Sequence, residues 1–202
     1  MRGKMREPAA DKVTAILETA AELFASKGYE ATSMRDIAQG AGVSKSLLYH
    51  HFTDKYQIFT RITSQSGLGL NEAVARAIPK EASASEQLEI FMRTTADFFE
   101  ENRLSWISAS QEFWTSHEAQ MSLQMKLRRD SFETMLRRIL EEGVKRGEFQ
   151  ISDVRLAGRM ILSSLNWMYR WYNPAGSRAA RDIAGEYYRM IAFGITPRGE
   201  QG

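Results

Sequence analysis

Apolar residues recur at spacings of three and four along almost the whole chain, and this periodicity limits the fold more than any other feature of the sequence. In the segment 11–27, for example, Ile16, Ala20 and Phe24 fall on one face of a helix. No segment alternates with the period of two that is typical of strands. The sequence therefore predicts an all-α fold.

Glycines and capping residues divide the first 55 residues into short helices. The expected stops and caps, in chain order, are Gly28, Ser33 with Asp36, the turn Gly40-Ala41-Gly42, Ser44, and either Thr53 or Asp54. The third helix runs to about His51. Longer amphipathic helices are expected near 54–77, 84–101, 103–116, 118–146, 152–172 and 178–194.

Composition excludes several classes of protein. The chain has 202 residues, 43% of them hydrophobic and 26% charged, as in an ordinary globular protein. It has no cysteine, no apolar run long enough to span a membrane, and no apolar stretch after its basic first residues. We therefore expect a cytoplasmic protein without disulfides. The net charge of +2 is too small to indicate nucleic-acid binding.

The segment 34–55 has the pattern of a helix-turn-helix, in which the second helix can enter the major groove of DNA. At about 100° per residue, Leu47, Leu48 and His51 fall on the inward arc of that helix. The opposite arc carries groups that can bond base edges or phosphates, namely Lys45, Ser46, Tyr49 and His50. The alternative is a packed three-helix core with a solvated polar face.

These residues closely resemble the N-terminal signature of the TetR family over about residues 11–60. The matching positions are Phe24, Gly28-Tyr29, Thr32, Ile37-Ala38, Ala41-Gly42-Val43-Ser44, Leu48-Tyr49-His50-His51-Phe52 and Lys55. The resemblance implies a dimeric DNA-binding protein with a small head on a larger helical ligand-binding domain. It implies the DNA contacts Thr32, Ser33, Ser44, Lys45, Ser46, Tyr49, His50, His51 and Lys55. Periodicity turns His51 inward, which favours a phosphate contact at the helix end over base reading.

On this basis we expect a flexible basic tail at 1–10, a DNA-binding domain at 11–56, and a ligand-binding and dimerisation domain at 57–197. The tail cations Arg2, Lys4 and Arg6 either reach DNA or remain solvated. Gly67 and Gly69 mark either a hinge or a helix end.

The two C-terminal segments, 152–172 and 178–194, combine apolar stripes with small residues. Such helices suit a four-helix interface with a second copy of the chain. The alternative is that both stripes pack within one subunit.

Bulky apolar residues are concentrated in 91–135, where they either fill a core or line an adaptable pocket. The run Asn166–Gly176 resembles a TetR subgroup whose members often sense acyl-coenzyme A thioesters. Arginines would then hold the phosphates, although each could instead form a surface ion pair, and Arg129 is a further candidate cation. The predicted ligand-binding residues are Trp106, Phe113, Trp114, Met125, Arg128, Arg159, Trp167, Met168 and Arg170.

Other functions fit less well. The sequence lacks the nucleophile, phosphate-loop and dinucleotide motifs of common enzymes. Adjacent His50 and His51 are a poor metal chelate, so we expect no metal and no cofactor. A helical protein-interaction module would not need Lys45, Tyr49 and His50 exposed together. A regulator of free hydrophobic compounds, of the multidrug type, is the nearest rival to an acyl-CoA sensor.

Overall fold

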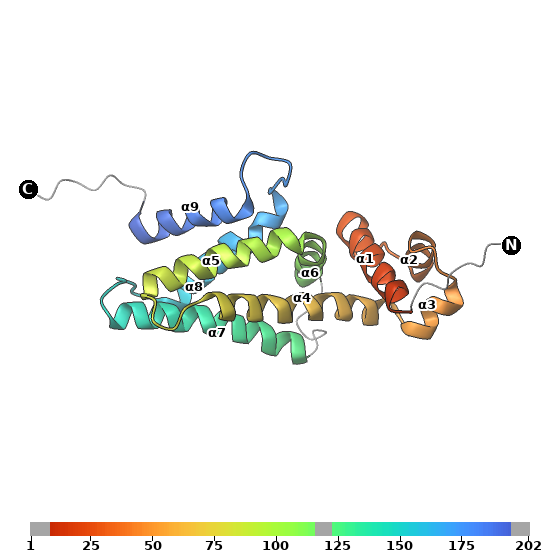
Figure 1. Ribbon diagram of the computed structural model, residues 1–202, viewed down its shortest axis with the longest axis horizontal. Helices are drawn as coiled ribbons and strands as arrows, with labels where there is room; N and C mark the ends of the chain where they lie inside the picture. Colours follow the sequence, from red (N-terminus) through yellow and green to blue (C-terminus); the bar gives the residue numbers. More distant parts are fainter. Residues whose placement is uncertain (1–8, 116–122, 195–202) are drawn as a thin grey trace, which may run out of the picture. The chain divides into compact units, whose positions relative to one another are not determined.

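The computed structural model describes residues 9–115 and 123–194. Over these two ranges the chain forms helices and turns and contains no strand, which confirms the predicted all-α fold (Figure 1). The helices are α1 (Ala9–Lys27), α2 (Met34–Gly40), α3 (Lys45–His51), α4 (Lys55–Ala77), α5 (Ala84–Glu101), α6 (Arg103–Thr115), α7 (Leu123–Lys145), α8 (Val154–Asn166), the 3-10 turn η2 (Trp167–Arg170) and α9 (Ala180–Phe193).

The described chain divides into two compact units. The first comprises residues 9–66 and 104–115, and the second comprises residues 67–103 and 123–194. Helix α4 is continuous across the division, so it begins in the first unit and ends in the second.

The core of the first unit forms where the periodicity placed it. Ile16, Ala20 and Phe24 of α1 are fully buried, together with Ile37 of α2 and Leu48 of α3. Removing these apolar groups from water is the main stabilisation of such a small helical unit. Helix α6 belongs to the same unit and contacts α1, because the buried Ser108 hydroxyl donates to the Ala21 carbonyl at 3.3 Å.

The second unit is a helical bundle in which α5 lies alongside α9 and also contacts α7 and α8 (Figure 1). A shared apolar core lies between these helices. Its buried members are Leu88, Phe91, Met92 and Phe99 of α5, Leu136 and Leu140 of α7, Ile161 and Leu165 of α8, Met168 of η2, and Ala184 and Tyr188 of α9.

The predicted helix 152–172 is wrong at its C-terminal end. The α-helix ends at Asn166, and residues 167–170 form a tighter 3-10 turn. Pro174 lies a few residues beyond and disfavours helical conformation at Asn173, so helical structure ends before that residue. The turn allows both Met168 and Tyr172 to point into the core.

The start of the predicted helix 118–146 lies outside the described residues, and α7 is described from Leu123. The tail cations Arg2, Lys4 and Arg6 also lie outside the described residues. Because α4 continues through Gly67 and Gly69, the interpretation of these glycines as a helix end is wrong. A Cβ at Gly69 would lie 3.1 Å from ring carbons of Phe98, so this glycine lets α4 approach α5 closely.

Candidate functional site

The start of α2 and the turn between α2 and α3 have the predicted cap and glycine. The Ser33 hydroxyl accepts a hydrogen bond from the Asp36 amide, and the Asp36 carboxylate accepts from the Ser33 amide at 2.9 Å, which completes a capping box. The hydrogen bonds from Ser33 lower the pKa of Asp36. After α2 the chain reverses at Gly42, whose φ of +63° is a conformation that favours glycine. The predicted short helix, glycine turn and capped second helix are confirmed.

Helix α3 presents two faces of different chemistry. Ser44 caps it by accepting from the Leu47 amide at 3.1 Å, and Leu48 is fully buried. On the opposite side four side chains are exposed, and Tyr49 is 54% accessible. These exposed residues are Lys45, Ser46, Tyr49 and His50, as the helical periodicity predicted.

His51 lies at the boundary between these faces. Its side chain is half-buried, and its ring lies 5.1 Å from the ring of His50, centroid to centroid. The position at the end of α3 agrees with the expectation that His51 is the weakest candidate for reading bases. Its contact with a phosphate stays a prediction.

Thr32 is engaged inside the first unit, and its contact with DNA stays a prediction. The residue is only 2% exposed, and its hydroxyl donates to the Gly28 carbonyl at 2.8 Å. The sequence placed Thr32 next to the cap of α2 but carried no sign that its hydroxyl is used inside the turn. Ser33 and Ser44 remain exposed beside the first amides of α2 and α3.

At the start of α4, one of the two candidate caps is used, and Lys55 forms hydrogen bonds within the first unit. Of the two candidate caps, the Asp54 carboxylate accepts from the Gln57 amide at 2.8 Å. The Lys55 ammonium donates to the Tyr29 carbonyl at 2.6 Å, and the Lys55 side chain is only 21% exposed. Its predicted contact with DNA therefore competes with contacts inside the first unit.

The predicted ligand-binding residues occupy several different environments. Trp106 is half-buried on α6, and the side chains of Phe113, Trp114 and Met125 lie outside what the structure describes. Met168 is buried in the core of the second unit, whereas Trp167 beside it is 53% exposed. The remaining members are Arg128, half-buried on α7, and the exposed Arg159 and Arg170.

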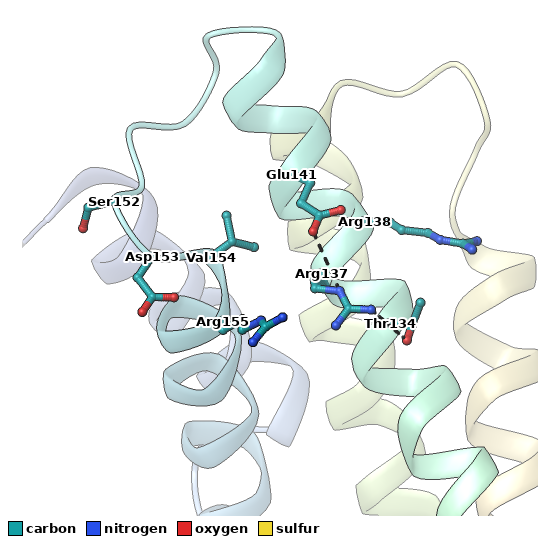
Figure 2. Close-up of a pocket in the computed structure, with 8 residues that line it drawn as sticks. All are labelled: Thr134, Arg137, Arg138, Glu141, Ser152, Asp153, Val154 and Arg155. Atoms are coloured by element: carbon teal, nitrogen blue, oxygen red, sulfur yellow. Dashed lines mark hydrogen bonds and ion pairs between the residues drawn. The ribbon is translucent and has the colours of Figure 1, made fainter.

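Two hollows of the second unit are formed by described residues alone, and neither of these two is lined by a predicted ligand-binding residue. One of about 570 Å³ lies between the loop after η2 and α9, and its walls include Trp171, Tyr187 and Met190. The other, of about 670 Å³, opens between α7 and the start of α8 (Figure 2). Its lining is polar and consists of Thr134, Arg137, Arg138, Glu141, Ser152, Asp153, Val154 and Arg155.

The candidate arginines differ in whether they form the surface ion pairs that were the alternative to phosphate binding. Arg129 lies 3.7 Å from the carboxylate of its neighbour Asp130, as the surface-pair alternative expected. Arg159 makes no ion pair with the described residues, and Arg170 lies 5.9 Å from the ring of Trp167. The outward side of α8 and η2 therefore offers cations beside an aromatic ring.

The same two C-terminal segments expose large apolar side chains. Leu156 is 64% exposed, and Met160, Trp171, Met190 and Phe193 are also about half exposed, while Ile161 and Leu165 of α8 are buried. Helix α8 is thus apolar on two sides. In the sequence these residues belong to one broad apolar stripe. The structure divides the stripe into residues buried in the second unit and residues exposed on its surface, a division that the sequence pattern does not give.

The start of α9, next to this apolar surface, is fixed by one carboxylate. Glu100 accepts hydrogen bonds from the Tyr172 hydroxyl and, at 3.0 Å, from the Ala180 amide. Burial, with the adjoining Glu100 carboxylate, raises the pKa of Tyr172 to about 12. The phenol therefore keeps its proton and remains a donor at physiological pH.

Residues 9–115 and 123–194 contain no group of three His, Asp or Glu side chains placed to hold a metal ion. In the same ranges, no helix combines the length and the apolar character that crossing a membrane requires.

The geometry of α2, its glycine turn and α3 defines a helix-turn-helix protein with a separate helical unit. Comparison with family models then specifies the family: residues 16–62 match the model for bacterial regulatory proteins of the tetR family, and residues 81–195 match the tetracyclin repressor-like C-terminal domain. The second match alone covers more than half of the chain. The chain belongs to the TetR family of regulators, as its sequence motif predicted.

Individual relatives are similar over nearly the whole length. The TetR family transcriptional regulator PfmR from Thermus thermophilus is 42% identical, with a TM-score of 0.82, over 90% of this chain and 99% of that one. The transcriptional repressor KstR2 of Mycobacterium tuberculosis is 28% identical over 91% of this chain and 92% of its own. The structure of AibR with isovaleryl coenzyme A and operator DNA is 25% identical, with a TM-score of 0.75, over 89% of this chain and 97% of that one.

Proposed function

We propose that this protein is a transcriptional repressor that binds a palindromic operator as a homodimer and leaves it when an acyl-CoA thioester binds. The observation that carries the DNA-binding part is the exposed polar face of α3, which is held outward by the burial of Leu48 on the other side. Such a regulator acts in the cytoplasm, where its operator is, and needs neither a metal nor a cofactor.

In this proposal the residues of α3 divide between base reading and phosphate binding. Lys45, Ser46, Tyr49 and His50 face the major groove, where an ammonium can donate to guanine and hydroxyls can bond either strand. Ser33 and Ser44 lie at helix N-termini, where amides attract phosphate, and His51 contacts a phosphate at the end of α3.

Charge reversal on this face tests DNA binding directly. We expect Lys45→Glu to abolish binding to a pool of random duplexes at low salt, because a carboxylate would replace an ammonium at the surface of a polyanion. The matched control is Lys145→Glu at the end of α7, whose side chain is 79% exposed and which should bind as the wild type does. Fluorescence anisotropy measures both. Equal affinities for the two variants would place the DNA interface elsewhere and would favour the protein-interaction alternative.

The homodimer is proposed from the exposed apolar side chains of α8, η2 and the C-terminal end of α9. Exposed Leu156, Met160, Trp167 and Met190 supply apolar surface on these three elements. Exposed apolar patches of this kind mark interfaces, and a two-fold axis would bring each copy's patch against the same patch of its partner. The alternative that both stripes pack only within one subunit leaves these side chains in water.

The inducer is proposed from a relative and from the cations near this surface. AibR, a relative over most of its length, binds isovaleryl coenzyme A. In this chain Arg159 and Arg170 are exposed and lie on the same elements as Trp167. Guanidinium groups suit the phosphates of coenzyme A, and apolar residues suit its acyl group. Trp106, Phe113, Trp114, Met125, Arg128 and Met168 stay predicted ligand residues.

A panel of acyl-CoA thioesters titrated beside the corresponding free acids tests this assignment. We expect the thioesters to release a selected operator duplex and the free acids to do so at least about tenfold less well, because they lack the phosphates that arginines bind. Release by thioester and free acid at equal concentrations would contradict coenzyme A recognition and favour the multidrug-type alternative. Binding of DNA must weaken thioester binding by the same factor that the thioester weakens DNA binding.

A further inference from the structure

The polar hollow of about 670 Å³ between α7 and the start of α8 brings together guanidinium groups from two helices. Arg155 points from the first turn of α8 toward α7, where Arg137 lies between Glu141 and Thr134 (Figure 2). Arg138 of α7 lines the same hollow. Like charges repel one another at short range, and an anion placed between them replaces this repulsion by attraction.

Most donors of these guanidinium groups are not used within the described residues. The Arg137 guanidinium donates to the Thr134 hydroxyl at 3.4 Å and lies 3.8 Å from the Glu141 carboxylate. Arg155 is exposed and forms no ion pair within residues 9–115 and 123–194. A guanidinium has five N–H donors in a planar fork. Donors therefore remain for a ligand on both helices.

The two carboxylates of the hollow leave Arg155 without a counter-charge. Asp153 caps α8, where its carboxylate accepts from the Leu156 amide at 3.0 Å. Glu141 is more than half exposed, and its contact with Arg137 is a long pair between residues four apart on one helix. Exposed pairs of this kind contribute little stability. An incoming anion therefore competes with Glu141 for Arg137 at small cost.

The walls of the hollow indicate the class of its ligand. Thr134 and Ser152 add two hydroxyls, which can donate to anionic oxygens, and Val154 is the one aliphatic residue of the lining. Such walls do not suit an acyl chain, which needs an apolar pocket. Neighbouring guanidinium groups suit phosphate, because each fork can donate two parallel hydrogen bonds to its oxygens.

We infer that this hollow is a second binding site, which takes a small molecule through its phosphate groups. Arg155 and Arg137 hold the phosphate oxygens from two sides, and the two hydroxyls of the hollow donate to them. The site goes beyond the proposed function, in which the inducer binds through Arg159 and Arg170. The phosphates can belong to a free anion or to the coenzyme A part of an inducer, since both carry the same chemistry.

Titration of the full chain with inorganic pyrophosphate, without DNA, tests the site by calorimetry. We expect Arg155→Gln to weaken binding at least about tenfold, because the ligand loses charge-assisted hydrogen bonds. Glu141→Gln should strengthen binding about threefold or more, because the carboxylate no longer competes for Arg137. A gain of affinity cannot come from misfolding, so these two variants together keep the test decisive.

The matched control is Lys145→Gln, which removes one positive charge from α7 outside the hollow. Lys145 lies about 12 Å beyond Arg137 along the helix axis, more than the Debye length of about 8 Å at physiological ionic strength. This variant should therefore bind pyrophosphate as the wild type does. No binding by the wild type overturns the inference. Equal weakening in Arg155→Gln and Lys145→Gln also overturns it, because that result would indicate general attraction of an anion to a positive surface.

Competition separates the two sources of the phosphates. If pyrophosphate and an acyl-CoA thioester weaken each other's binding, the hollow holds the coenzyme A part of the inducer, and if they bind independently, it takes a separate anion. Either result supports the site. If no acyl-CoA thioester binds, the proposed inducer fails, and the pyrophosphate titration still decides the role of the hollow.

Discussion

Two half-buried helices in this molecule expose opposite chemistry. Helix α3 buries Leu48 and exposes Lys45, Ser46, Tyr49 and His50, whereas α8 buries Ile161 and Leu165 and exposes Leu156 and Met160. Each helix uses one side for its own unit. A polar, hydrogen-bonding face suits a hydrated polyanion, and an apolar face suits another apolar surface. The exposed side of each helix, more than the fold it belongs to, indicates its partner.

The largest effect is expected from placing a charge on the apolar face. Met160→Glu would bury an unpaired carboxylate in the proposed dimer, which costs several kcal/mol. Because two linked heads bind with an avidity gain of about 10²–10⁴, loss of the dimer should weaken operator binding by at least about a hundredfold. Light scattering and operator titration measure the two effects. A dimeric Met160→Glu variant with normal affinity would remove the face of α8 from the interface.

A smaller and more selective effect is expected on the polar face. Lys45→Ala should cost about 1–3 kcal/mol and relax base preference at one or two operator positions if the ammonium reads guanine. The dimer should be unaffected, which distinguishes this variant from Met160→Glu. Titration against single-base operator variants gives the preference. A uniform loss on every duplex would instead indicate that Lys45 contacts phosphate.

The smallest effect is expected for a polar group whose contacts stabilise only the first unit. Ser33→Ala should cost about 1 kcal/mol through loss of the capping box. Asp36 has a lowered pKa in the folded protein, so its contribution is present above its ordinary value of 3.8 and is lost as the pH falls through the lowered value. Thermal unfolding should therefore differ most between Ser33→Ala and the wild type at pH 7, and the difference should narrow at strongly acidic pH, where the hydroxyl–amide bond of the cap remains but the bond to the ionised carboxylate is lost. A difference that is the same at both pH values would assign the whole effect to the bond between the Ser33 hydroxyl and the Asp36 amide.

The helices and turns of residues 34–55 were largely predictable because the interactions that set them are local in the chain. The caps Ser33, Ser44 and Asp54 act within three residues along the chain, and the faces of α3 follow from helical geometry. The hydrogen bonds of Lys55 to the α1–α2 turn could not be predicted, because its partners lie 25 and 26 residues away and no local pattern reports such a contact. In the second unit, Met168 and Trp167 were grouped as ligand residues. The change from α8 to a 3-10 turn alters the angular step at this point, so periodicity could not separate the buried residue from the exposed one.

The continuity of α4 has a consequence for how the chain can tolerate insertions and deletions. Near its start this helix carries Lys55 and Phe59, which contact the α1–α2 turn, and further along it carries Gly69 and Asn71, which contact α5 and α7. One residue added between these groups would rotate the second pair by about 100° relative to the first. An inserted residue within α4 would therefore change which side chains the helix turns toward its neighbours within one unit, whereas the loops 78–83 and 146–153 lie outside the helices and can accept added residues.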